Sequence, residues 1–115
     1  MSLDIELYKL VDVGNKEPEH VTFFDANVTH NLNKMAKEAG IYDHLWRSDE
    51  IGIYHAEELI SPLSVGLQKM KSNPERFKKF NPPNGWGTYD LFLPWIEKYI
   101  EACKRYPKTL IYISR

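Results

Sequence analysis

The residues best suited to chemistry lie in two short polar segments. The first, DANVTHN (25–31), places an aspartate and a histidine five residues apart. A carboxylate and an imidazole serve as general acid and base when a fold brings them within hydrogen-bond reach of a substrate. The second, NPPNGWGTYD (81–90), combines side-chain amides with Trp86 and Tyr89. Amides and aromatic rings are suited to binding rather than to bond breaking.

The first segment also has a structural interpretation. Asn and Thr side chains accept hydrogen bonds from the free amides of a helix's first turn, and a helical pattern follows this segment directly. Asn27, Thr29 or Asn31 could each be that cap, depending on where the helix begins. One cap needs only one side chain, and the other polar groups would lie where a strand turns into a helix, a common place for ligand contacts. Capping is the favoured interpretation, and a binding cluster that adds Asp25 and His30 is the alternative.

In the second segment, two prolines and two glycines fix an unusual backbone path around Trp86 and Tyr89. The favoured interpretation is that Trp86 packs into the core beneath a rigid loop. If the rings are exposed instead, they would be contact anchors of the kind found in binding hot spots. The two segments together supply the candidate binding residues, namely Asp25, Asn27, His30, Asn31, Asn81, Asn84, Trp86 and Tyr89.

Other classes of site find little support. The four histidines are ten, fourteen and eleven residues apart, which fits no established zinc spacing, so neither a metal site nor a cofactor is predicted. There is no nucleophile elbow and no phosphate-binding loop. The single cysteine, Cys103, lies in an apolar helical stripe typical of a buried side chain. Basic residues surround Phe77 and Phe80, but a pI near 6.4 argues against nucleic-acid binding.

Hydrophobic periodicity predicts the elements that must position these segments. Alternating apolar residues predict a strand over 4–11, and a second strand fits 20–25; the turn-forming residues between them make an antiparallel hairpin. A β-branched and aromatic run predicts a third strand over 109–114. Apolar spacing of three and four predicts helices over about 30–39, 56–70 and 88–103. A cap followed by proline predicts a short helix over 74–80, and the short apolar run 41–46 fits one more helical turn.

Three positions define the expected helix boundaries. Pro62 must either kink its helix or mark a restart with Ser61 as cap. Asn73 is expected to cap the next helix, with Pro74 at its first position, and Thr88 to cap the last one. The sequence thus predicts a single α+β domain over 1–115, in which the N-terminal hairpin and the C-terminal strand form a small antiparallel sheet packed against three or four helices.

Length and composition agree with this class. The chain has 115 residues, of which 43% are hydrophobic and 27% charged, as in ordinary globular proteins. No apolar run approaches the roughly 20 residues of a membrane-spanning helix, and the N-terminus lacks a signal-peptide pattern, so we expect a cytoplasmic protein. The charge is uneven, −7 over 1–62 and +6 over 63–115. Either the fold has faces of opposite sign, which favours a homo-oligomer or a charged protein partner, or folding interleaves the two halves.

Three segments, DANVTHNLNKMAKEAG, KSNPERFKKFNPPNGWGTYD and IEACKRYP, resemble a group of small uncharacterised bacterial and phage proteins. The resemblance covers most of the chain. It implies a shared compact fold and carries over no activity, cofactor or catalytic residue.

The missing catalytic signatures favour a non-catalytic cytoplasmic interaction module whose partner is a protein. The alternative is a small-molecule-binding protein or enzyme in which DANVTHN and NPPNGWGTYD form one pocket. In the enzyme, His30 and Asp25 would be the acid and base.

Overall fold

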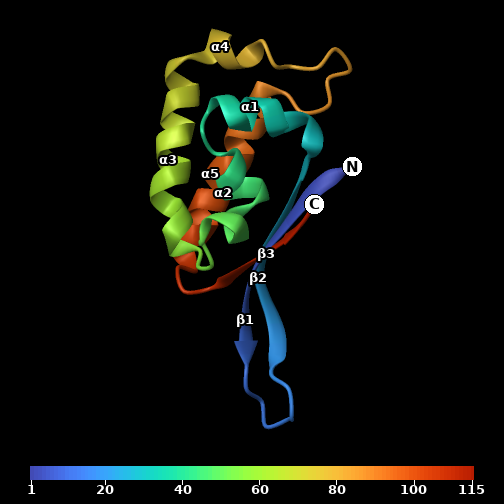
Figure 1. Ribbon diagram of the computed structural model, residues 1–115, viewed down its shortest axis with the longest axis vertical. Helices are drawn as coiled ribbons and strands as arrows, with labels where there is room; N and C mark the ends of the chain where they lie inside the picture. Colours follow the sequence, from blue (N-terminus) through green and yellow to red (C-terminus); the bar gives the residue numbers. More distant parts are fainter.

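The computed structural model describes residues 1–115 as a three-stranded sheet with helices on one side of it (Figure 1). Strands β1 (Ser2–Val11), β2 (Glu19–Thr29) and β3 (Leu110–Ser114) are antiparallel and lie in the order β2-β1-β3. The predicted α+β fold, with an N-terminal hairpin joined by the C-terminal strand, is confirmed. β2 is longer than predicted because the alternation of inward side chains continues through Ala26 and Val28, which pair opposite Ile5 and Leu3.

All the regular elements between β2 and β3 are helices, joined by loops. Helices α3 and α5 are the longest and pack against each other. The elements are η1 (His30–Leu32), α1 (Asn33–Glu38), α2 (Tyr42–Trp46), η2 (Ser48–Ile51), α3 (Glu57–Ser72), α4 (Pro74–Lys78) and α5 (Tyr89–Arg105).

The expected helix boundaries are right in part. Thr88 caps α5, its hydroxyl accepting from the Leu91 amide at 3.3 Å. Of the two alternatives expected at Pro62, the restart at Ser61 does not occur, since α3 runs through Pro62 without a break. Asn73 does not cap α4 with its side chain. Its Nδ2 instead donates to the Lys69 carbonyl at 2.9 Å and satisfies an unpaired acceptor at the C-terminal end of α3.

One hydrophobic cluster joins the sheet to the helices. Its 24 buried residues include Leu3, Ile5 and Leu7 on the inner face of β1. Gly66 of α3 is part of this packing, since a Cβ there would collide with the Ile41 side chain. Cys103 is fully buried, as predicted. None of the helices is both long and apolar enough to cross a membrane.

Beyond Tyr8 the β1–β2 hairpin continues as a two-stranded arm without helical cover (Figure 1). β3 pairs with β1 only as far as Tyr8, which lies opposite Leu110. At the same level β2 contains a bulge, because Leu7 pairs with Phe24 while Tyr8 pairs with Thr22. The arm makes the molecule elongated, with a longest extent of 53 Å.

Candidate functional site

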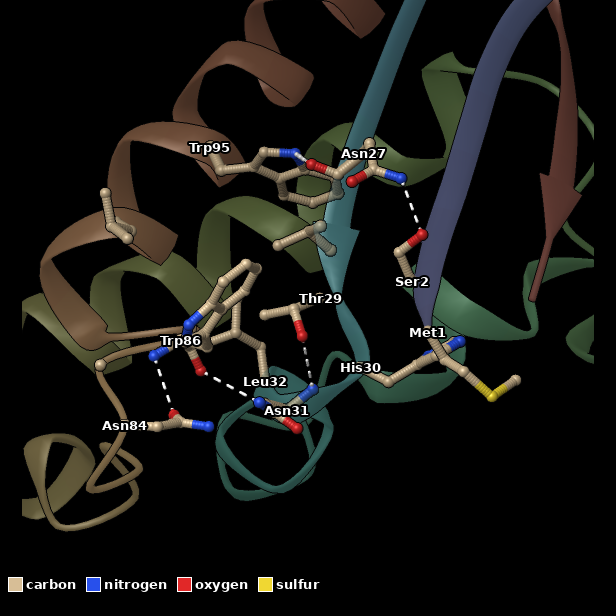
Figure 2. A pocket seen from close by; sticks show the side chains of 14 residues that line it. Met1, Ser2, Asn27, Thr29, His30, Asn31, Leu32, Asn84, Trp86 and Trp95 are labelled. Carbon is tan, nitrogen blue, oxygen red and sulfur yellow. Dashed lines mark hydrogen bonds between the residues drawn. The ribbon is translucent and has the colours of Figure 1, made fainter.

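The two polar segments meet at one open pocket of about 880 Å³ (Figure 2). The end of β2 and helix η1 form one wall, and the 84–87 loop with the start of α5 forms another. Five of the predicted binding residues line this pocket, namely Asn27, His30, Asn31, Asn84 and Trp86. None of the lining side chains belongs to Asp, Glu, Lys or Arg.

Trp86 is exposed, so the favoured interpretation of it as a core plug is wrong. The residue is 68% exposed, while its backbone carbonyl and amide are both hydrogen bonded. The Trp86 carbonyl accepts from Asn31 Nδ2 at 3.2 Å, and its amide donates to Asn84 Oδ1 at 3.0 Å (Figure 2). The residue of this loop that packs closely against the end of β2 is the next one, Gly87, where an added Cβ would lie 2.7 Å from Thr29 Cγ2.

Tyr89 is buried and is not part of the pocket, which corrects its assignment as a contact anchor. It is 5% exposed, and its hydroxyl donates to the Met70 carbonyl at 2.9 Å. Tyr89 begins α5 three residues before Phe92 and therefore shares the inward face of that helix. Asn81 supports this start, because its Oδ1 accepts from the Tyr89 amide at 2.8 Å. Asn81 does not line the Trp86 pocket either.

Asp25 and His30 do not line a common pocket, so the structure does not bring the expected acid–base pair together. Asp25 lies within β2 on the outer face of the sheet and lines a smaller hollow with Asp4 and Glu6. Asn27 lies on the same face, where its Nδ2 donates to Ser2 Oγ at 2.9 Å. The sequence predicts that Asp25 and Asn27 lie where the second strand ends, but β2 continues to Thr29.

Thr29 and His30 both have structural partners. Thr29 is the cap among the three candidates, since its hydroxyl accepts from the Asn31 amide at 3.3 Å. His30 Nδ1 accepts from Trp46 Nε1 at 2.8 Å, which places the proton of a neutral ring on Nε2. His30 carries the only ionisable side chain in the pocket.

The pocket residues that the sequence did not indicate include two large apolar side chains of α5. Leu91 and Trp95 lie one helical turn apart near the start of α5, and both face the pocket. Leu91 is 64% exposed, while the Trp95 Nε1–H donates to the Asn27 carbonyl at 3.0 Å. Their separation of four residues, which places both on one face of the helix, is the only signal of this pair in the sequence.

The arrangement is suited to binding an uncharged group through apolar contact and hydrogen bonds. Two indole rings and three side-chain amides face the space, and no carboxylate lies beside the imidazole. Nowhere in the chain do three or more His, Cys, Asp or Glu side chains gather in a way that could hold a metal ion. No protein-family model, curated protein or solved structure matches the chain.

Proposed function

We propose that this protein is a non-catalytic interaction module that binds an extended, proline-rich segment of a partner protein at Trp86. The observation that carries the proposal is that Trp86 is 68% exposed although its backbone carbonyl and amide are both hydrogen bonded within the chain. Tryptophan is enriched among the residues that dominate binding energy. Because the backbone at Trp86 is already ordered, only the side chain loses conformational freedom when a partner covers it.

The unused polar groups beside the ring favour a proline-rich segment. Trp86 Nε1–H and Asn84 Nδ2–H donate no hydrogen bond within the chain, so both are free to meet a ligand's carbonyl groups. Proline residues present carbonyls without amide protons and adopt the extended helix that aromatic-lined grooves recognise. Trp95 and Leu91 add apolar surface to the same pocket.

The pocket offers little for catalysis. His30 is its only ionisable side chain, and its Nδ1 is engaged by Trp46. Ser2 and Thr29 supply hydroxyl groups, but neither is hydrogen bonded to a base. Nucleophilic catalysis requires such a base beside the hydroxyl.

The test compares Trp86→Ala with Val65→Ala, a change on α3 at a position that is equally exposed and outside the pocket. A fluorescein-labelled oligoproline is titrated with each protein and followed by fluorescence anisotropy. We expect Trp86→Ala to weaken binding by more than about tenfold, equivalent to about 1.4 kcal/mol, while Val65→Ala binds like the parent. Both variants should unfold at nearly the parent temperature, since exposed side chains contribute little to stability.

Two results would contradict the proposal. Equal affinity of the parent and Trp86→Ala would show that the indole is not the anchor. A collapse of the melting temperature in Trp86→Ala would show that the ring belongs to the packing.

A small uncharged molecule is the second candidate, because the two segments do form one pocket and its volume lies within the roughly 300–1,000 Å³ of ligand sites. A thermal-shift screen of planar, uncharged metabolites tests this. A compound that binds there raises the melting temperature of the parent and leaves that of Trp86→Ala unchanged.

A further inference from the structure

The Trp86 pocket adjoins a second hollow of about 590 Å³. His30 and Asn31 line both spaces and form the wall that they share. Beyond this wall lie Lys34 of α1 and Lys79, the residue after α4. One ligand that lies across Asn31 would therefore contact an uncharged indole on one side and two ammonium groups on the other.

The two lysines are free to meet an external charge. Both are exposed, and neither makes an ion pair within the chain. The nearby Arg76, by contrast, is paired with Glu38. The second hollow contains no Asp or Glu, so nothing in its lining neutralises the ammonium groups.

We infer that the segment bound at Trp86 carries acidic side chains close to the residue that covers the indole, and that these lie against Lys34 and Lys79. The inference rests on the proposed binding of an extended segment. A polyproline helix rises about 3.1 Å per residue, so groups a few residues apart span two adjoining hollows. Lysine is a mobile point charge, which suits a carboxylate whose position along the segment varies.

The contribution of these pairs is modest and depends on salt. Exposed ion pairs contribute little each, so we expect two of them to raise affinity by about fivefold at low ionic strength. The gain should disappear at high salt, because exposed charges are screened within a few ångströms at about 1 M.

The experiment uses two fluorescein-labelled peptides, an oligoproline with a glutamate-rich end and the same oligoproline with a glutamine-rich end. Anisotropy titrations at low and high salt compare the parent with Lys34→Gln/Lys79→Gln. The matched control is Lys69→Gln/Lys98→Gln, which removes the same charge from two exposed, unpaired lysines outside both hollows. Trp86→Ala is included as the test of the pocket itself.

We expect the glutamate peptide to bind the parent about fivefold more tightly than the glutamine peptide at low salt. Lys34→Gln/Lys79→Gln should abolish this difference without weakening the glutamine peptide, and the control pair should keep most of it. Trp86→Ala should weaken both peptides.

Three outcomes would overturn the inference. If both peptides bind the parent equally and Trp86→Ala weakens both, the acidic requirement is wrong while the proposed function stands. If neither peptide binds the parent, both proposals fall. A fluorescein-labelled oligothymidine is titrated in the same way. If it binds more tightly than the glutamate peptide and loses affinity in both Trp86→Ala and Lys34→Gln/Lys79→Gln, the two hollows bind a nucleic acid.

Discussion

The contact between Gly87 and the end of β2 predicts an unequal pair of glycine substitutions in the 84–87 loop. Gly87 has a φ of +88°, and an added Cβ would lie 2.7 Å from Thr29 Cγ2 and 3.1 Å from Leu32 Cγ. The left-handed conformation costs an alanine roughly 1–2 kcal/mol. Forcing an extra carbon into packed surroundings costs about 1–3 kcal/mol more. Gly87→Ala should therefore lower the free energy of unfolding by about 2–5 kcal/mol.

Gly85→Ala is the matched control. Gly85 has a φ of +73° and no atom near its added Cβ, so only the backbone cost of roughly 1–2 kcal/mol applies. The effect of alanine on the unfolded chain is common to both variants and cancels in the comparison. Urea unfolding followed by circular dichroism measures both free energies with the parent in parallel. Equal losses in the two variants would refute the close approach of the loop to Thr29 and Leu32.

Two further predictions concern ionisable groups outside the pocket. Glu58 accepts the backbone amides of His55 and Tyr54 at 2.9 and 3.0 Å, and these hydrogen bonds lower its pKa. A lowered pKa stabilises the fold above the unfolded pKa, so the parent should exceed Glu58→Gln in stability at neutral pH. This advantage should shrink as the pH falls below about 4 in urea titrations, and an advantage that persisted at pH 2 would contradict it. Burial raises the pKa of the Cys103 thiol to about 12. Iodoacetamide at pH 8 should therefore label unfolded but not native protein, and mass spectrometry measures the labelling. Rapid labelling of native protein would contradict this prediction.

The elements that the sequence predicted well are those set by local chemistry. The Thr88 cap and the proline at the first position of α4 depend on a few neighbouring residues, and both are present in the structure. The sheet could also be inferred, because the hairpin and the C-terminal strand show their apolar alternation directly. These features need no knowledge of what the element packs against.

The errors occur where tertiary packing decides between two local options. The sequence at the end of β2 is largely polar. Ala26 and Val28 nevertheless face the helices, and the strand stays paired with β1 as far as Thr29. Trp86 and Tyr89 were treated as equivalent rings. Tyr89 in fact shares the spacing of the inward face of α5, which a strict count from Thr88 would have shown. The exposure of Trp86 had no such signal, because Trp86 lies in a loop without helical spacing, and the contact of that loop with Thr29 is tertiary.

The two-stranded arm offers a place to attach a fluorescent dye away from the Trp86 pocket. Its turn lies at one end of the long axis, and the 84–87 loop lies near the other (Figure 1). Asn15 in that turn is exposed, while the only native thiol is buried. A single dye attached through Asn15→Cys would therefore serve as an energy-transfer donor to a labelled peptide, and the efficiency would show at which end of the molecule the peptide settles.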